Sequence, residues 1–495
     1  MSTSAEPLEQ ERPRTLPPIP WVQYAIPVGI GLLIWFLPHP AAVSQIAWHM
    51  LAIFVATIVA IITRPLPMGA VTLIGLLVCI LTDTVPLVAV VDPETGKAGP
   101  TALMGFSNTT IWLIVMAFMI SAGFQKTGLG RRIALWFVSK VGKKMLGVSY
   151  GLALADLVMA PAIPSATARG GGIMAPIMKS VAETYDSKPG PTARRAGAFL
   201  SINVGQVNAI TRAMFVTAMA GNPLIVSLAS DQGVELSWLK WAAAAIVPGL
   251  VALLVVPWVV YMVYPPELKD TPEIVEMAKD ELRVLGPLTG AEKMMTFTFV
   301  LLLFFWTVGD IVMDISATTT GIIGLVVLLI SGVLTWQDVL DQKAGWDTMV
   351  WFAVLFMMAS ALNTYGLITW ASGKVASSLG DYSWPVALLI LILVYFFSHY
   401  LFASATAHIS AMYPAFLAAA IALGAPPVMS ALVFGYLSNL FTSLTQYAGG
   451  ASPALFGTGY NTTGQWWRTS AIAGLASLTI WIVVGGSWMK LIGFW

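Results

Sequence analysis

Two short polar stretches inside apolar sequence decide the fold of this chain. Residues 164–172 read Pro-Ser-Ala-Thr-Ala-Arg-Gly-Gly-Gly, and residues 403–410 read Ala-Ser-Ala-Thr-Ala-His-Ile-Ser. Proline and glycine interrupt helices, and irregular backbone at membrane depth is tolerated only where protein buries it or where it lines a wet cavity. We therefore expect each stretch to be the tip of a re-entrant hairpin, the hairpins being formed by 144–183 and 384–422.

The two tips belong to a longer internal repeat. Ser165 and Ser404 are offset by 239 positions, and further identical residues keep the same offset. These further pairs are Trp112 and Trp351, Met119 and Met358, Ser121 and Ser360, and Ala122 and Ala361. If the units enter the membrane from opposite sides, they form an inverted repeat, which is typical of secondary transporters. A duplicated channel or membrane enzyme is the alternative.

Composition places the whole chain in the membrane. Of 495 residues, 57% are hydrophobic and 10% are charged, against about 25% charged in soluble domains. This excludes an ordinary soluble enzyme, a disordered protein and a nucleic-acid binder, and the net charge of +1 attracts no nucleic acid. A spanning helix needs about 20 apolar residues. The apolar runs predict an all-α polytopic membrane protein with about eleven spanning helices plus the two hairpins.

Basic residues set the expected orientation, because Lys and Arg favour the cytoplasmic side. Most of the 25 lie on one side when the N-terminus is cytoplasmic and the C-terminus is outside. The predicted parts are a cytoplasmic tail (1–20), scaffold helices with an amphipathic linker (21–143), a first transport-domain half (144–264), a cytoplasmic surface loop or helix (265–293), scaffold helices with a second linker (294–383) and a second transport-domain half (384–495).

The hairpin tips are the predicted substrate site. The half-helix that follows each tip points its N-terminal N–H groups at the tip, and Ser and Thr hydroxyls beside them suit carboxylate oxygens. A second break follows in each unit, at 217–223 and 445–453; each break is either a simple kink or an unwound stretch that supplies ligands. The candidate ligands are Ser165, Ala166, Thr167, Arg169, Thr217, Ser404, Ala405, Thr406, His408 and Thr445, with Arg212, Gln446 and Asn222 as weaker candidates.

Ionisable residues at membrane depth are costly and therefore functional candidates. Arg169 either bonds the backbone of the tip, holds substrate charge or stands in for a bound cation. His408 is its mate in the second unit, and a nearby carboxylate would keep it charged near neutral pH. Arg212 either faces the substrate cavity or pairs with Asp156.

The tips, the repeat and residues 127–135, Thr-Gly-Leu-Gly-Arg-Arg-Ile-Ala-Leu, resemble the divalent anion/sodium symporter family. The resemblance covers nearly the whole chain from about residue 21, and is greatest to the bacterial 2-oxoglutarate/malate, citrate/succinate and tartrate/succinate antiporters. It implies a homodimer in which a mobile transport domain moves like an elevator against a scaffold. The family's Ser-Asn-Thr tips bind substrate carboxylate. Ser165, Thr167, Ser404 and Thr406 match this motif, whereas Ala166 and Ala405 replace the asparagine.

The sequence contains no P-loop, no Gly-x-Ser-x-Gly and no His-Glu-x-x-His, and its single cysteine excludes internal disulfides. We therefore expect no enzyme activity, cofactor or metal. The predicted function is exchange of C4/C5 dicarboxylates or citrate across the bacterial inner membrane. Arg169 and His408 would offset the substrate's charge without sodium, since an unpaired buried ion costs several kcal/mol. Sodium-coupled symport is the alternative. The expected partners are the substrates, the bilayer and a second copy of the chain.

Overall fold

The computed structural model describes residues 21–91, 98–309, 312–313, 315–402 and 404–495. The predicted tail 1–20 and Ala403 lie outside this set. Within it the chain forms helices and no strand, as its composition predicts; two isolated β-bridges join Val91 to Ala98 and Lys144 to Asp270.

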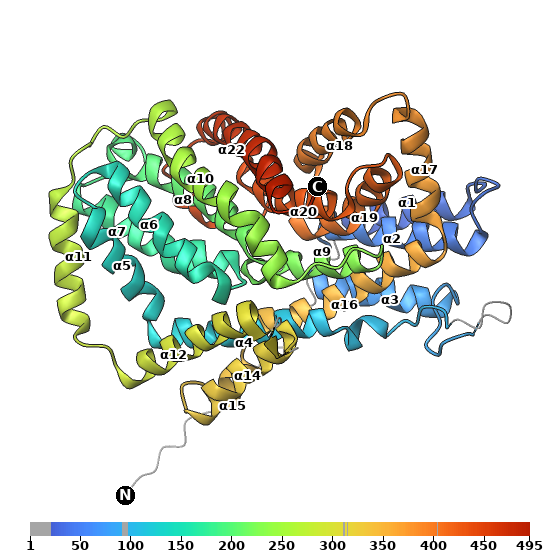
Figure 1. Cartoon of the computed structure of the whole chain (residues 1–495), viewed down its shortest axis with the longest axis horizontal. Coiled ribbons are helices and arrows are strands. Elements are labelled where there is room, and N and C mark those ends of the chain that lie inside the picture. Colours follow the sequence, from blue (N-terminus) through green and yellow to red (C-terminus); the bar gives the residue numbers. More distant parts are fainter. Residues whose placement is uncertain (1–20, 92–97, 310–311, 314, 403) are drawn as a thin grey trace, which may run out of the picture.

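The helices fall into two successive groups of similar order (Figure 1). The first group is α1 (Trp21–Phe36), α2 (Gln45–Thr63), α3 (Met68–Leu81), α4 (Thr109–Thr127), α5 (Leu129–Val141), α6 (Met145–Met159), α7 (Ala175–Thr184), α8 (Gly197–Met214), α9 (Gly221–Ser230) and α10 (Trp238–Val263). The surface helix α11 (Pro272–Leu285) connects the groups. The second group is α12 (Gly290–Phe304), α14 (Ala317–Ile330), α15 (Trp336–Leu340), α16 (Lys343–Thr364), α17 (Leu367–Leu379), α18 (Trp384–Ser398), α19 (Ala405–Ala422), α20 (Pro427–Leu440), α21 (Ser452–Phe456) and α22 (Thr463–Leu491).

The internal repeat appears in the backbone. A 3₁₀ turn at Ala160–Ala162 follows α6, and an equivalent turn at His399–Leu401 follows α18 with the same offset. Gly128 and Gly366 precede α5 and α17 with φ of 73° and 80°, a conformation that glycine adopts without strain. The two units therefore share element order and turn geometry.

Among the described residues, nine helical segments are long and apolar enough to cross a membrane, and α1, α3 and α14 are shorter apolar helices. The nine include α6 with its 3₁₀ turn, α18 with its turn, and α19, which are arms of the predicted hairpins. The sequence of the apolar run 408–422 predicts a half-helix that is too short to span, and this prediction is wrong: the run belongs to the 18-residue helix α19, which begins at Ala405. The helix is longer because Ser404 starts it three residues earlier.

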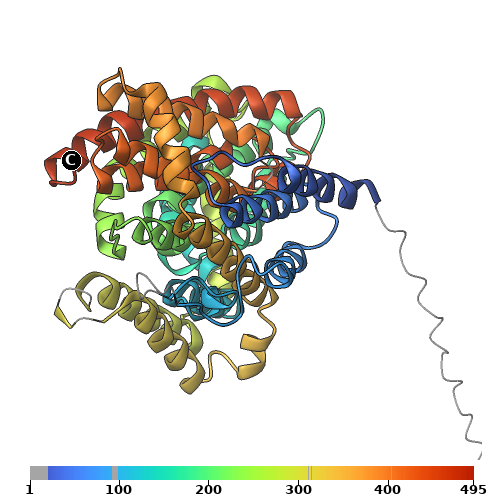
Figure 2. The same ribbon diagram turned by 90° about the vertical axis from the view of Figure 1, so that its right-hand side faces the viewer.

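The helices pack in two sets. α4 packs against α14 and α16, and α12 packs against α14. Of these helices, α4, α12 and α14 lie in the lower part of both views (Figures 1 and 2). Above them, α8 packs against α10 and α20, and α10 packs against α22, so that the second parts of both groups interlock. Every residue of α8 is buried, including five polar ones from Asn203 to Arg212. The polar side chains of α8 therefore lie inside the protein, where they need hydrogen-bond partners from the protein, from water or from a ligand.

Candidate functional site

The first hairpin tip differs from its expected form. We predicted that Gly170–Gly172 break the helix, but these glycines lie in a π-helix, Thr167–Met174, that continues into α7. The non-helical residues come earlier, around Pro164. Glycine is needed here for close packing: a Cβ on Gly170 would clash with the Cβ of Ala451. The prolines therefore interrupt the hairpin, and the glycines bring it against the second break.

The two tip serines play the same local role. The Ser165 hydroxyl accepts a hydrogen bond from Ala168 N at 3.1 Å, and the Ser404 hydroxyl accepts one from Ala407 N at 3.3 Å. Both serines thus cap the following half-helix, as N-cap residues do. Thr167 is exposed and donates to the carbonyl of Gly450 at 3.0 Å.

Arg169 is sealed inside the first hairpin. Its side chain has 0% exposure, and its Nε donates to Asp156 Oδ1 at 2.7 Å. Its Nη1 donates to the carbonyls of Ile163 and Ala218 at 2.7 and 3.2 Å, and its Nη2 donates to Thr211 Oγ1 at 3.2 Å. Because Asp156 neutralises Arg169, the expectation that Arg169 supplies free positive charge to the substrate is wrong. Arg169 instead ties the tip to the first break.

Thr217 also joins the first break to the first tip. Its hydroxyl donates to the carbonyl of Pro161 at 2.6 Å and accepts from Trp238 Nε1 at 3.1 Å. Both hydrogen-bonding directions are therefore used inside the protein, and Thr217 is fully buried. The break does face the tip, but its threonine hydroxyl is not free for a ligand.

Arg212 differs from Arg169 in having no carboxylate partner among the described residues. It is 3% exposed, and its Nη1 donates to Thr442 Oγ1 at 2.8 Å, in the 3₁₀ turn Phe441–Ser443 that precedes the second break. No ion pair between described residues includes Arg212, and its Nε has no hydrogen-bond partner in that part of the chain. The predicted pair with Asp156 is wrong, because Asp156 lies beside Arg169 instead. Arg212 is thus a buried cation without a carboxylate.

A chain of amides holds Arg212 in place. Asn222 Nδ2 donates to the carbonyls of Arg212 and Phe215, both at 2.9 Å. Asn439 Nδ2, on α20, then donates to Asn222 Oδ1 at 2.7 Å, which connects the first break to the helix that leads into the second. Asn222 is therefore a positioning residue. Asn439 and Thr442 were missed from the sequence, because they lie in a run taken as a simple apolar span; their signal was the polar sequence Ser438-Asn439 within it.

Both tips meet the second break at two glycines. A Cβ on Gly450 would lie 2.5 Å from Arg212 Nη1 and 3.5 Å from the Ala166 side chain. A Cβ on Gly449 would lie 4.0 Å from Ala405 N. The structure therefore brings Ala166, Ala405 and Arg212 around one loop, with Thr167 bonded to it.

Two other candidates in the second break have different surroundings. Thr445 is fully buried, and its hydroxyl has no hydrogen-bond partner among the described residues. Gln446 Oε1 accepts from Trp467 Nε1 at 2.6 Å. Thr445 can therefore offer a free hydroxyl, whereas the Gln446 oxygen is already occupied. Thr406, on the second tip, is buried at 8% exposure.

His408 lies behind the second tip. Its side chain has 0% exposure, and its Nε2 is 2.8 Å from the Ser398 hydroxyl. The rings of Tyr395, Phe402 and Phe441 surround it at 4.6 to 4.9 Å. In the part of the chain that the structure describes, its contacts include no carboxylate. His408 faces Ser398 and aromatic rings, so the expectation that a carboxylate keeps it charged beside the substrate finds no support here.

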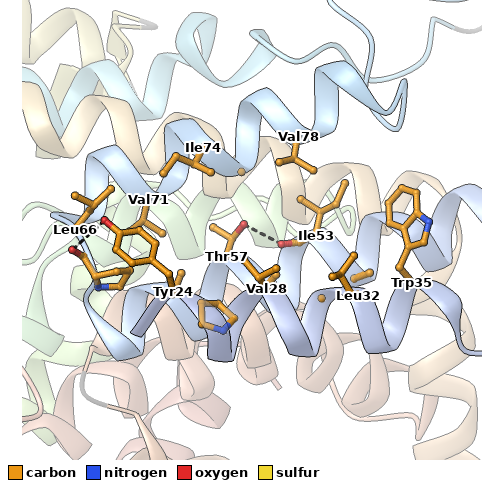
Figure 3. A pocket seen from close by; sticks show the side chains of 17 residues that line it. Tyr24, Val28, Leu32, Trp35, Ile53, Thr57, Leu66, Val71, Ile74 and Val78 are labelled. Carbon is orange, nitrogen blue, oxygen red and sulfur yellow. Dashed lines mark hydrogen bonds between the residues drawn. The ribbon is translucent and has the colours of Figure 1, made fainter. Parts of the chain in front are cut away.

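An apolar cavity of about 290 Å³ lies away from the tips, between α1, α2 and α3 (Figure 3). Its few polar groups are satisfied internally: Tyr24 donates to the Pro65 carbonyl at 3.5 Å, and Thr57 donates to the Ile53 carbonyl at 2.8 Å. The residues that line it include none with a charge. An anion would lose its hydration there without replacement, so this cavity is not the anion site.

The arrangement around Gly449 and Gly450 suits an anion. It combines the buried Arg212 cation, the threonine hydroxyls and the N-termini of two half-helices, each of which carries partial positive charge. A buried cation without a partner is costly to keep, and an incoming carboxylate relieves that cost. Ala166 and Ala405 have small side chains, which leaves room for a ligand at the two tips.

Known proteins provide an independent comparison. Residues 19–495 match the family described as the sodium:sulfate symporter transmembrane region. The chain is 50% identical over 476 residues to YflS of Bacillus subtilis (strain 168), a candidate malate transporter, covering 96% of this chain and 97% of that protein. It is 45% identical to the chloroplastic dicarboxylate transporter 1 of Spinacia oleracea, covering 94% and 80% of the two chains. It is 35% identical to the L-tartrate/succinate antiporter of Escherichia coli (strain K12), covering 96% and 99%.

A solved structure shares the fold. The crystal structure of the Alcanivorax borkumensis YdaH transporter, described as having an unusual topology, matches with a TM-score of 0.52 and 14% identity, covering 86% of this chain and 98% of that one. At this identity the match speaks for the fold alone. Because the family match runs through nearly the whole chain, the protein belongs to the sodium:sulfate symporter transmembrane family, and it is a membrane transporter rather than an enzyme.

Proposed function

We propose that this transporter exchanges C4/C5 dicarboxylates across a bacterial plasma membrane and does not need sodium. Relatives named for malate, dicarboxylates and tartrate/succinate support the substrate class. Arg212 supports the proposal from the structure, because it is a buried cation that pairs with no carboxylate in the described part of the chain, at the place where both tips meet the second break. The proposal includes a homodimer, an elevator movement and a cytoplasmic N-terminus.

Arg169 supports independence from sodium. In broken-helix transporters, unwound carbonyls commonly coordinate sodium. Here the Arg169 guanidinium donates to the Ile163 carbonyl of the tip and the Ala218 carbonyl of the break. A tethered cation thus holds together the two segments that a sodium ion would otherwise join. Since it cannot leave with the substrate, Arg169 makes this bridge permanent.

Exchange follows from the charge left in the empty carrier. Asp156 neutralises Arg169, but Arg212 stays uncompensated when no substrate is bound. Moving an unpaired buried charge through the membrane is costly. The return step therefore favours a carrier that is loaded with a counter-substrate.

Uptake into liposomes that contain the purified protein tests the proposal. We expect labelled succinate or malate to enter only when unlabelled dicarboxylate is inside, equally with and without a sodium gradient. Protein-free liposomes are the control for leak. Sodium-driven uptake into empty liposomes would instead establish symport, the second candidate, which the free buried hydroxyl of Thr445 favours as a spare cation ligand.

Removing one tip hydroxyl should weaken substrate binding. Thr167→Val and Thr406→Val keep the side-chain size and should each raise the apparent KM. A hydrogen bond to a charged group contributes about 1.5–3 kcal/mol, which predicts an increase of about 10- to 150-fold for Thr406→Val. The effect of Thr167→Val should be smaller, because the Thr167 hydroxyl must leave the Gly450 carbonyl before it can donate to a carboxylate. Initial exchange rates over a substrate series measure this effect. Thr318→Val is the matched control, since Thr318 is half-buried and its hydroxyl donates to the Thr109 carbonyl at 2.8 Å, away from the tips. An unchanged KM in both tip variants would remove the tips from the substrate site.

The inverted arrangement of the units predicts opposite labelling of the two hairpins. A cysteine at Lys188, after the first hairpin, should react with a membrane-impermeant thiol reagent only from the cytoplasmic side. A cysteine at Ala422, at the end of α19, should react only from outside; both positions are exposed. The buried Cys79 is first replaced by alanine. Labelling of both cysteines from one side would contradict the proposed topology.

A further inference from the structure

A second cavity, of about 570 Å³, runs along the first hairpin. Its wall includes Ala168 and Gly172 on the π-helix, and Pro176 and Ser180 on α7. The π-helix continues directly into α7, so these residues form one continuous wall. It ends beside Thr167, which is exposed at the tip. The cavity therefore extends along α7 towards the proposed substrate site.

The opposite wall holds an ion pair that the transport mechanism has not used. Arg131, on α5, and Glu281, on the surface helix α11, both line the cavity. Arg131 Nη2 lies 2.7 Å from Glu281 Oε2, and the two side chains are 57% and 29% exposed. The pair thus bridges the space between α5 and α11, and both side chains remain in contact with water.

The next residue shows why Arg131 is positioned there. Arg132 Nε lies 2.6 Å from Glu292 Oε1, and its Nη1 donates to the Gly286 carbonyl at 2.7 Å. These side chains are 14% and 4% exposed, so this neighbouring pair is largely dry. Arg132 anchors the connection between α11 and α12 on α5. With that anchor fixed, Arg131 on the same turn is held at the cavity.

We propose that Arg131 is a second carboxylate-binding residue on the transport path, and that Glu281 is its built-in competitor. This inference rests on the proposed function. An exposed ion pair contributes only about 0–1 kcal/mol, so a substrate carboxylate can replace the Glu281 carboxylate at little cost. The planar guanidinium fork suits either carboxylate. Arg131 thus exchanges the Glu281 carboxylate for a substrate carboxylate while the substrate moves towards the tip.

The inference predicts an effect on one side of the membrane only. Glu281→Gln removes the competing charge and should lower the apparent KM about 1.5- to 5-fold for substrate offered from the α11 side. Arg131→Gln should raise the KM on that side. Neither variant should change the KM on the opposite side. Exchange measured in liposomes of known protein orientation, with substrate varied on each side in turn, gives both values.

Asp280→Asn is the matched control. It removes one negative charge from the same helix, but Asp280 pairs with Arg283 at 2.7 Å on the exposed surface and does not line the cavity. We expect no change in its KM. Equal shifts in Glu281→Gln and Asp280→Asn would mean that surface charge alone is responsible and would overturn the inference, as would a shift on both sides.

Blocking the cavity is a second test that does not depend on charge. A Cβ on Gly172 meets no atom within 4 Å, so Gly172→Leu should fold and project into the open space. We expect it to lose most of its exchange rate. Gly464→Leu, at the start of α22, also has open space and should keep the wild-type rate. Full activity of Gly172→Leu would show that substrate does not pass here.

Failure of the inference and failure of the proposed function are distinguishable. If the wild type exchanges dicarboxylates but Glu281→Gln keeps the wild-type KM on both sides, the inference alone is wrong. If the wild type exchanges no dicarboxylate, the proposed function is wrong and the inference falls with it.

Discussion

Replacing Arg212 with methionine should abolish dicarboxylate exchange without making the folded protein less stable to heat. The side chain is 3% exposed, and it has no carboxylate partner within the described ranges. An unpaired buried ion costs several kcal/mol, so an apolar side chain of similar volume removes a cost of folding. The substrate, however, loses the cation that offsets its charge. Exchange rates and thermal unfolding of the purified protein measure the two effects separately.

Arg212→Lys is the control for this prediction. It keeps the positive charge but loses the planar fork, so we expect weakened exchange rather than none. Thr442, which accepts from Arg212, also donates to the Asn439 carbonyl at 2.6 Å and thus keeps a partner in either variant. Normal exchange by Arg212→Met would show that the substrate's charge is compensated elsewhere. A large loss of heat stability would assign Arg212 a structural role instead.

Replacing Asp156 with leucine should have the largest effect on stability. It leaves Arg169 buried with 0% exposure and without its carboxylate partner. Breaking a buried ion pair on one side costs about 3–5 kcal/mol. Thr211, which also donates to Asp156, loses an acceptor as well. We expect a marked fall in the unfolding temperature of the purified protein, together with loss of exchange.

The double variant Asp156→Leu with Arg169→Met separates charge from packing. Replacing both partners with apolar groups removes the unpaired charge, so most of the lost heat stability should return. Exchange should stay low, because Arg169 no longer ties the Ile163 carbonyl to the Ala218 carbonyl. If the double variant is as unstable as the sum of the two single variants, the two residues act independently and the assignment of a locked pair is wrong.

Arg169 and Arg212 show how far sequence reasoning can go. Both stand out because each is a charged residue in an apolar setting, and that property is readable from the chain alone. Their roles are not readable in this way. Asp156 is 13 positions from Arg169 along the chain and lies on the other arm of the same hairpin, whereas Thr442 is 230 positions from Arg212. Only the folded arms show which cation is neutralised.

The sequence by itself determined the class of the protein, the repeat and the location of the tips. Apolar length, proline and the preserved offset of 239 are local or countable properties, and they act regardless of how the helices pack. Tertiary structure decided the surroundings of each candidate residue. It buried Arg169 against Asp156, left Arg212 without a carboxylate, and enclosed His408 in aromatic rings. The reason is that the energy of a charge depends on its distance to other charges and on its access to water, and both are set by segments far apart in the chain.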